Sequence, residues 1–361
     1  MKRKLMSVLL TGVMVLSLTA CGQAAGSGNA ADTSKSPDSA APAAQAAAPA
    51  ADSASGKTVI KIASGLTAQA AENVGAYEFE KIIEEKYPEF DVQVYTDAQL
   101  GDDTACAQDV SMGNLEAVIL SPSVLTGMCS SLSVFDLPFL FPNYEAADAV
   151  MESDVAKDIA TELAGNGLHV LAWYENGFRQ LTNSKVDVHT PADVAGLKIR
   201  TMENEIHLAA FKALGAVPTP MAFSEVFTAM ESGTIDGQEN PISTIYLNSF
   251  YEVNKYCSLT NHVYGPKLFL LSESLFQKLT DEQKAFFEEA AAKSAVTDKE
   301  VNRKQCDDYI QSLRDAGMTV TELTNEEHQA FVDATAPIYD EFKSQIGEDL
   351  IKKVQDVCAK Y

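Results

Sequence analysis

Alternating apolar and polar residues mark the first two strands of the folded chain. The alternation covers residues 58–63 and 91–95, and both stretches are rich in β-branched or aromatic side chains. Between them a helical period extends from about 72 to 86 and ends before Pro88. A nearly continuous apolar run at 115–120 predicts a third strand that is covered on both faces. This βαβαβ order predicts a mainly parallel sheet.

The remaining periodic segments continue the alternation of strands and helices. We expect helices at about 144–152, 154–165, 204–214, 324–344 and 347–359, and strands at 169–174, 198–201, 216–219, 256–259 and 263–272. The apolar and aromatic segment 136–141 predicts a buried crossing segment. From 280 to about 316 the chain keeps helical spacing without Pro or Gly, which predicts one helix of roughly 55 Å that bridges two domains.

The N-terminus is typical of an export signal. Three basic residues at positions 2–4 precede an apolar run at 5–18, which is too short to span a membrane comfortably as a mature helix. A small residue before Cys21 is typical of a bacterial lipobox, so we expect removal of residues 1–20 and lipid modification of Cys21. Residues 21–56 then form a disordered tether, because Ala, Ser, Gly and Pro offer too little apolar surface to offset the entropy of ordering.

The charge of the chain limits its partners. Its formal net charge is −24, and loss of the three basic signal residues would make it −27. No basic stripe is present to neutralise phosphates, which argues against nucleic acid and against a peripheral surface for anionic lipid. An anionic ligand is still allowed, but local arginines must capture it against the overall field. The five cysteines beyond Cys21 contain no CxxC pair, so a disulfide scaffold is not indicated, although one long-range bridge stays open.

Sequence motifs for catalysis and for metal binding are absent. The five histidines show no HExxH spacing, and the chain has neither a G-x-S-x-G elbow nor a G-x-G-x-x-G loop. Asp102 and Asp103 open a predicted helix, where the helix dipole alone favours acidic residues, so we give them a structural role and no part in acid–base catalysis. We therefore predict no catalytic residue, no metal and no cofactor.

Two polar segments interrupt the apolar pattern in the second half of the chain. Residues 196–200 (GLKIR) deliver Arg200 at the end of a predicted strand, and 235–241 (IDGQENP) predict a turn and an amide-rich loop. Arg179 lies in a third segment, NGFRQ, where Gly177 allows a close approach of the backbone. A guanidinium matches a carboxylate bidentately, and an asparagine nearby can bind the rest of a polar ligand. Alternatively, each arginine caps a helix or pairs with surface acids.

Seven motifs follow one another along the chain: QLGDD at 99–103, GFR at 177–179, GLKIR at 196–200, LGAVPTPMAFSE at 214–225, IDGQENP at 235–241, FYEV at 250–253 and LTNH at 259–262. In this order they resemble the DctP-type substrate-binding proteins of TRAP transporters, over essentially all of 57–361. The resemblance implies an α/β, two-lobed, periplasmic-binding-protein-like (Venus flytrap) fold with a long domain-bridging helix. From it we expect lobe I to comprise 57–176 and about 266–305, and lobe II to comprise 177–265 and about 306–361.

The resemblance also implies the residues that bind a ligand in the cleft between the lobes. Arg200 is expected to form a bidentate salt bridge with a ligand carboxylate. Arg179 is expected to be a second cationic contact, and Asn240 a hydrogen-bond partner of the carboxylate or of a neighbouring hydroxyl. Three further residues are expected to belong to the ligand-binding site: Phe223, which packs against the ligand, Gln238 and Glu239.

Residues expected on the N-terminal side of the cleft indicate which class of acid the site binds. Ser121, Pro122 and Ser123 stand where sialic-acid-binding members carry a polar, acidic wall, and Gly65 stands where they place an asparagine. The resemblance therefore implies a smaller acid, such as a uronate, an aldonate or a dicarboxylate. A monomeric receptor, lipid-anchored at the cell surface or in a periplasm, would deliver this acid to the membrane subunits of a TRAP-type secondary transporter. Two alternatives stay open: a sensor input domain, and a secreted enzyme that modifies sugar acids.

Overall fold

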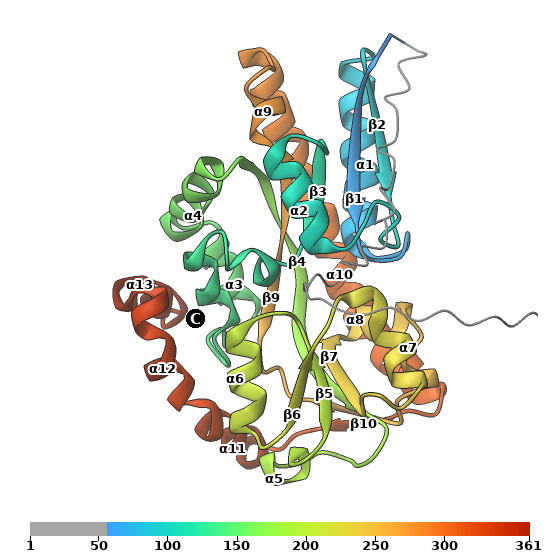
Figure 1. Ribbon diagram of the computed structural model, residues 1–361, viewed down its shortest axis with the longest axis vertical. Helices are drawn as coiled ribbons and strands as arrows, with labels where there is room; N and C mark the ends of the chain where they lie inside the picture. Colours follow the sequence, from blue (N-terminus) through green and yellow to red (C-terminus); the bar gives the residue numbers. More distant parts are fainter. Residues whose placement is uncertain (1–55) are drawn as a thin grey trace, which may run out of the picture. The chain divides into compact units, whose positions relative to one another are not determined.

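The computed structural model describes residues 56–361. The predicted signal peptide, Cys21 and all of the tether but its last residue therefore lie outside the described residues. Within them, ten strands form one continuous network of paired strands with the central order β2-β1-β3-β9-β4-β7-β5-β6, and helices pack around it (Figure 1). The predicted α/β class is confirmed.

The first part of the sheet holds three of the predicted strands side by side. β1 (Thr58–Ser64) is parallel to β2 (Phe90–Tyr95) and to β3 (Ala117–Leu120), with α1 (Ala71–Lys86) and α2 (Asp103–Met112) as connections. The prediction of a mainly parallel sheet is confirmed for these three strands, and the rest of the network mixes parallel and antiparallel pairs. β9 (Tyr264–Ser272) is antiparallel to β3, because the chain returns into this sheet from the second half of the molecule.

The second part of the sheet is built around a strand that the sequence does not predict. β7 (Gly237–Pro241) is antiparallel to β4 (Leu168–Asn183) and parallel to β5 (Lys198–Thr201), which pairs in parallel with β6 (Val217–Pro220). The expected turn and amide-rich loop at 235–241 is thus wrong in its second part: a buried strand takes the place of the loop, because both neighbouring strands pair with its backbone. β8 (Tyr256–Leu259) pairs with β4 and with the equally unpredicted β10 (Thr319–Glu322).

β4 and β9 connect the two parts of the sheet. The first part of β4 pairs with β9 as far as Phe178, and from Arg179 onward β4 pairs with β7 and β8. The register of the β4–β9 pair shifts between Glu175 and Gly177, where Gly177 has a φ of +98°. We call the strands and helices on the β2 side of this point lobe I and those on the β6 side lobe II.

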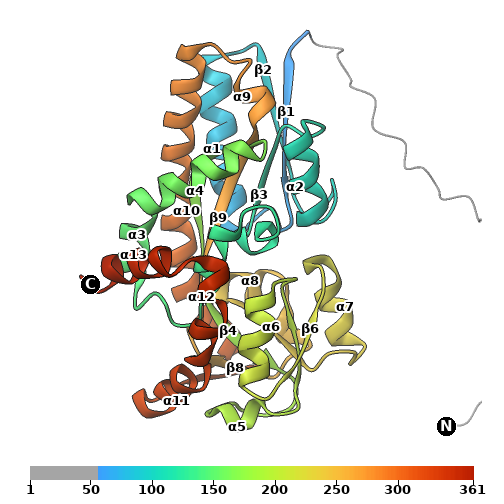
Figure 2. The ribbon, with the colours of Figure 1, turned by 60° about the vertical axis from the view of Figure 1, so that its left-hand side comes forward.

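Helix α10 (Asp281–Asp315) runs along both lobes, as the sequence predicts (Figure 2). It packs against α1 in lobe I, against β4, and against α8 (Ile242–Leu247) and β10 in lobe II. A capping box fixes its first turn, in which Thr280 accepts from the backbone N–H of Gln283 and the Gln283 side chain accepts from the N–H of Thr280. The predicted bridging helix is therefore confirmed within the described chain.

The other helices cover the two faces of the sheet. Their bounds are α3 (Tyr144–Met151), α4 (Asp154–Gly165), α5 (Pro191–Val194), α6 (Glu205–Ala213), α7 (Val226–Glu231), α9 (Glu273–Phe276), α11 (Asn325–Thr335), α12 (Pro337–Ile346) and α13 (Glu348–Cys358). Four short 3-10 turns are η1 (Pro122–Leu125), η2 (Ser130–Asp136), η3 (Phe223–Glu225) and η4 (Phe250–Glu252).

The C-terminal helices differ from the prediction in two ways. The single helix expected at 324–344 is two helices, because Pro337 begins α12 and interrupts the hydrogen-bond ladder of α11. In addition, α12 and α13 pack against η2, α3 and α4 of lobe I, and their apolar side chains join the core of that lobe (Figure 2). We expected the whole segment 306–361 to belong to lobe II, but its C-terminal helices α12 and α13 pack on lobe I.

The predicted crossing segment at 136–141 is buried. Asp136, Leu137, Leu140 and Phe141 are all nearly inaccessible to solvent, and the three apolar side chains belong to the core of lobe I. None of the helices in residues 56–361 is both long enough and apolar enough to span a membrane.

Candidate functional site

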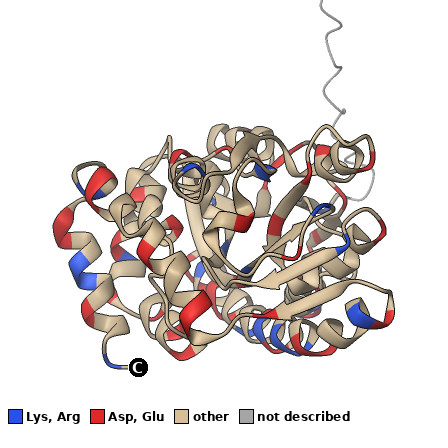
Figure 3. Cartoon of the chain, turned by 90° about the horizontal axis from the view of Figure 1, so that it is seen from below, with Lys and Arg blue, Asp and Glu red and all other residues tan. Residues whose placement is uncertain are grey.

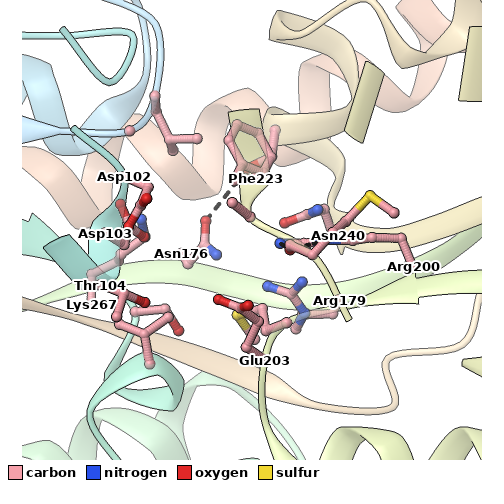
Figure 4. A pocket seen from close by; sticks show the side chains of 18 residues that line it. Asp102, Asp103, Thr104, Asn176, Arg179, Arg200, Glu203, Phe223, Asn240 and Lys267 are labelled. Carbon is pink, nitrogen blue, oxygen red and sulfur yellow. Dashed lines mark hydrogen bonds between the residues drawn. The ribbon is translucent and has the colours of Figure 1, made fainter. Parts of the chain in front are cut away.

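A cavity opens between the end of β1 and the start of α2 in lobe I and the ends of β5 and β7 in lobe II. Its empty space is about 610 Å³, part of which is solvent at the mouth. Figure 4 shows the charged and amide side chains that converge on it. The residues that line it are Gly65, Leu66, Asp102, Asp103, Thr104, Ser121, Val124, Asn176, Arg179, Arg200, Met202, Glu203, Met221, Ala222, Phe223, Asn240, Thr244 and Lys267.

Arg200 is a buried cation on the cavity wall. The residue is 3% exposed, and its Nε and Nη2 atoms donate to the carbonyl oxygen of Met221 at 3.0 and 2.7 Å. Within residues 56–361 no carboxylate lies within ion-pair distance of its guanidinium. Burial lowers the pKa of Arg200 to about 10, so it stays protonated at neutral pH.

Arg179 lines the same cavity but is neutralised by the protein itself. Its Nε and Nη2 atoms form a bidentate pair with the carboxylate of Glu239, and Nη2 also donates to the Glu239 carbonyl oxygen at 2.6 Å. Burial opposes the charged form of Glu239, yet Arg179, His207 and His262 together hold its pKa well below the usual value. Arg179 is therefore a fixed donor with a counter-ion in place.

Alternation along β7 places Glu239 on the face opposite to Gln238 and Asn240, and of these three residues Asn240 is the one that lines the cavity. Asn240 lines the cavity and donates through Nδ2 to Gln238 Oε1 at 2.6 Å. Gln238 is fully buried and donates to Thr182 Oγ1 at 2.8 Å. Glu239 points to the opposite face of the strand, toward Arg179 and the two histidines. The structure thus places Gln238 and Glu239 outside the cavity lining, where they support Asn240 and Arg179.

Phe223 and two of the four expected residues of the N-terminal wall line the cavity. Phe223 begins η3, lines the cavity, and places its ring 6.0 Å from that of Phe250. From lobe I, Gly65 and Ser121 line the opposite wall. Ser123 lies behind this wall and donates to the buried carboxylate of Asp136.

Several polar residues of the cavity are not predicted as ligand-binding residues by sequence reasoning: Asp102, Asp103, Thr104, Asn176, Glu203, Thr244 and Lys267. The sequence does not single out Asp103 as a cavity residue, because the helix dipole already explains an acidic residue at a helix N-terminus. Lys267 could have been predicted as a functional residue, because it is a charged residue inside the apolar strand β9. Its Nζ lies 2.7 Å from Glu72 Oε2, and Ser64 Oγ donates to the other oxygen of Glu72 at 2.6 Å.

Within residues 56–361 no group of three or more His, Cys, Asp or Glu side chains is arranged to hold a metal ion. The five cysteines of the same residues are free thiols. Figure 3 shows acidic residues on many helices with basic residues between them.

Comparison with known proteins identifies the family of the chain. The model of the bacterial extracellular solute-binding proteins, family 7 (DctP), matches residues 62–345. A solute-binding protein from Verminephrobacter eiseniae is 40% identical over 270 residues, which cover 74% of this chain and 79% of that protein.

Two solved structures are similar over the described lobes. The sugar acid binding protein DctPAm from Advenella mimigardefordensis, in complex with galactonate, has a TM-score of 0.82 at 34% identity and covers 84% of this chain and 98% of its own. A TRAP periplasmic solute-binding protein from Polaromonas sp. JS666, bound to D-erythronate, has a TM-score of 0.80 at 37% identity and covers 83% and 98%. The members of this family are extracytoplasmic binding proteins of transport systems, not enzymes. With its two-lobed α/β fold, the chain belongs to family 7 of the bacterial extracellular solute-binding proteins, the DctP-type substrate-binding proteins of TRAP transporters.

Proposed function

We propose that this protein is a receptor that binds a small organic acid through Arg200 in the cleft between the lobes and delivers it to a TRAP-type secondary transporter. The observation that carries the proposal is the buried guanidinium of Arg200, which has no carboxylate partner within residues 56–361. A buried charge without a partner is unfavourable, so the site gains stability when an anion enters. A ligand carboxylate is the anion that fits a planar guanidinium bidentately.

The remaining cavity residues complete the proposed contacts. The bonds from Arg200 to Met221 leave its Nη1 atom free to bind the ligand carboxylate. Arg179 supplies a second cationic donor whose position is fixed by Glu239, and Asn240 supplies an amide held by Gln238. Phe223 covers the apolar side of the ligand. In this arrangement Gln238 and Glu239 act through their neighbours and not by contact.

The two similar structures support the class of ligand. Galactonate and D-erythronate, which those proteins hold, are both hydroxylated carboxylic acids. A sugar acid of this kind or a dicarboxylate would supply the carboxylate that the unpaired cation of the cavity lacks within residues 56–361. We also propose that lipid modification of Cys21 anchors a monomeric receptor to the membrane, with 22–56 as its tether.

A thermal-shift screen of the purified full chain, freed of copurified ligand by dialysis, tests the proposal. The panel contains aldonates, uronates, dicarboxylates, 2-oxo acids and sialic acid. At a hundred times its dissociation constant, a bound acid should stabilise the fold by about 2.7 kcal/mol. Arg200→Ala should lose this stabilisation, while Arg314→Ala, which removes an exposed arginine of α10 paired with Glu322, should keep it. Silence across the panel, together with no small acid in mass spectra of the denatured protein, would overturn the assignment.

A further inference from the structure

A second, smaller space adjoins the cavity that holds Arg200. Its empty volume is about 260 Å³, including solvent at its opening. It is lined by the start of α1 in lobe I, including Ala71 and Glu72, by α8 in lobe II, including Thr244 and Leu247, and by Asn176 of β4. We call this space the rear chamber. Like the Arg200 cavity, it is built from both lobes.

Three residues line both spaces and so lie between them: Leu66, Asn176 and Thr244. Thr244 Oγ1 donates to Asn176 Oδ1 at 3.4 Å, and Figure 4 marks this bond with a dashed line at Asn176. The bond is longer than a usual bond between two oxygen atoms, so it restrains the two side chains only weakly. A ligand in the Arg200 cavity therefore meets the rear chamber behind a weakly held pair of side chains.

Hydrogen-bond donors without partners border the rear chamber. The side chain of Ala70 does not cap α1, and within residues 56–361 the backbone N–H groups of Ala71 and Glu72 have no acceptor. Asn176 is 7% exposed, and its amide nitrogen also has no acceptor in this part of the chain. Buried donors without partners are unfavourable, so an oxygen atom that accepts from them stabilises the site.

Buried carboxylates beside the rear chamber distinguish a neutral guest from a charged one. Glu72 is paired with Lys267 at 2.7 Å, and Glu175 is paired with Arg303 at 2.8 Å. Within residues 56–361 no lysine or arginine lines the chamber itself. A ligand carboxylate there would face two acids without a free cation, whereas a hydroxyl group brings no charge. The chamber therefore fits a neutral group that carries an oxygen atom.

We propose that the rear chamber binds the terminal hydroxymethyl group of a six-carbon sugar acid whose carboxylate is held by Arg200. The inference rests on the proposed function, because it adds chain length to what the same site selects. The hydroxyl oxygen accepts from Asn176 and from the first turn of α1, and the methylene group packs against Leu66 and Leu247. An acid one carbon shorter loses these hydrogen bonds and the burial of the methylene group.

Pairs of aldonates that differ only in the terminal carbon measure this selection. D-galactonate and L-arabinonate have the same configuration at carbons 2 to 4, as have D-gluconate and D-xylonate, and D-mannonate and D-lyxonate. Titration calorimetry of the full chain, freed of copurified ligand, gives the ratio of affinities within each pair. In the pair with the preferred configuration, we expect the six-carbon acid to bind at least about tenfold more tightly than the five-carbon acid.

Variants that fill the rear chamber test its role directly. Ala71→Val adds volume from α1, and Leu247→Phe adds it from α8 on the opposite lobe. Both should bring the ratio close to one, by weakening the six-carbon acid and leaving the five-carbon acid nearly unchanged. Leu247 is only half-buried, so its replacement serves if Ala71→Val does not fold. Ala68→Val is the control, because Ala68 lies in the same loop before α1, is half-buried and lines neither space.

The outcomes separate this inference from the proposed function. If the acids of a pair bind equally, or if the acids that bind are dicarboxylates or shorter aldonates alone, the rear chamber is not a subsite while the Arg200 site stands. If the filling variants weaken both acids of a pair by the same factor, the chamber affects binding in general and not chain length, and the inference is overturned. If no acid binds at all, the proposed function itself fails, and this inference fails with it.

Discussion

Arg179 and Arg200 are both buried beside the cavity, but they differ in what balances their charge. Arg179 is 1% exposed and holds the fully buried carboxylate of Glu239, whereas Arg200 donates only to a backbone carbonyl. Removing one partner of a buried ion pair leaves the other charge uncompensated. We therefore expect Arg179 to contribute to the stability of the fold, and Arg200 to the proposed binding of a ligand.

This difference predicts opposite behaviour for two similar substitutions in the absence of ligand. Arg179→Met should lower the free energy of unfolding by about 3–5 kcal/mol, because it leaves Glu239 without its main counter-ion. Arg200→Met should lower it far less, because no carboxylate of the described chain loses a partner. Urea denaturation of both variants measures the difference, and equal losses would contradict it.

His207 is the residue whose charge should make stability depend on pH in the alkaline range. Burial lowers its pKa, but Asp136 at 3.0 Å and Glu239 at 3.8 Å outweigh burial and raise it to about 9. Because the pKa is raised above the ordinary value of 6.5, the stabilisation is fully present below pH 6.5 and is lost as pH rises to about 9. The loss is about 3 kcal/mol.

Denaturation of the wild type and of His207→Gln between pH 6 and pH 10 tests this assignment. In the His207→Gln variant, the free energy of unfolding should decline much less between pH 6 and pH 10, since glutamine cannot release a proton in this range. His189→Gln is the control, because His189 lies near the surface between Asp187 and Glu327 and should alter the profile little. His262 should affect stability in a different pH range. Burial lowers its pKa, so its contribution to the free energy of unfolding is lost as pH falls below 6.5. An unchanged decline in His207→Gln would refute the prediction.

At the level of single residues, the sequence locates the cavity side chains that stand beside a recognisable pattern. Arg200 ends a predicted strand, and Arg179, Asn240 and Phe223 lie in the segments that resemble the family, so their approach to one cavity could be expected. The directions of the Gln238 and Glu239 side chains could not be predicted, because the sequence indicates a loop at 235–241. In the structure this segment is a strand, in which successive side chains point to opposite faces. The orientation of Asp103 toward the cavity depends on the packing of α2, which its local sequence does not reveal.

At the level of elements, apolar periodicity predicts the long helices and the apolar strands but not the short polar ones. β7 consists of Gly, Gln, Glu, Asn and Pro, and so has no hydrophobic pattern, yet all five residues are buried between β4 and β5. The side chains of Gln238, Glu239 and Asn240 form hydrogen bonds to one another or to β4. β10, α7 and α8 are too short for a period to be recognised. Such elements are fixed by tertiary contacts, which a local pattern does not reveal.

Helix α10 is joined to the crossing strands by a polar cluster that gives it a fixed position on both lobes. Arg303 donates to the buried carboxylate of Glu175 on β4 at 2.8 Å and to Asp148 on α3 at 2.8 Å. Tyr264 on β9 donates to the same Glu175 at 3.0 Å, and Asn302 does so at 3.2 Å. Helix α10 therefore contacts β4 through an ion pair in which Arg303 compensates the buried charge of Glu175.

Arg303→Met should reduce the free energy of unfolding by about 3 kcal/mol, the lower end of the range for a buried pair, because Arg303 is partly open to solvent. Lys304→Met is a matched control on the next residue, where the lysine forms an exposed i,i+4 pair with Asp308 and should give no measurable change. Urea denaturation of the two variants at pH 7 compares them. A loss in the control as large as that in Arg303→Met would show that the effect belongs to the helix surface and not to Glu175.

At the level of the whole molecule, contacts between the lobes beside the cavity should set how readily the receptor holds its ligand. Asn204 at the start of α6 in lobe II donates through Nδ2 to Asp136 Oδ2 at 2.9 Å and to the Ser123 carbonyl oxygen at 3.2 Å in lobe I. His207 in lobe II bonds to the same Asp136. A ligand that touches both lobes binds the closed form, so its apparent affinity falls with the population of that form.

Asn204→Asp tests this coupling without removing the helix cap. The Oδ1 atom of Asn204 accepts from the backbone N–H of Ile206 and His207, and an aspartate caps a helix equally well. The variant loses the donor to lobe I and places a second carboxylate beside Asp136. We expect ligand affinity to fall on the order of tenfold, as for the loss of a hydrogen bond to a charged group, with the order of preferred acids unchanged.

Asn143→Asp makes the same change at the cap of α3, where Asn143 accepts from Ala146 N and makes no contact with lobe II through its other side-chain atom, which donates to Tyr361. Its affinity should stay at the wild-type value. Calorimetric titration of both variants with one aldonate decides the question, because the two differ only in whether the cap also reaches across to the other lobe. If Asn204→Asp binds as tightly as the wild type, the contacts through Asp136 do not govern closure, and the ligand itself must supply the contacts that hold the lobes together.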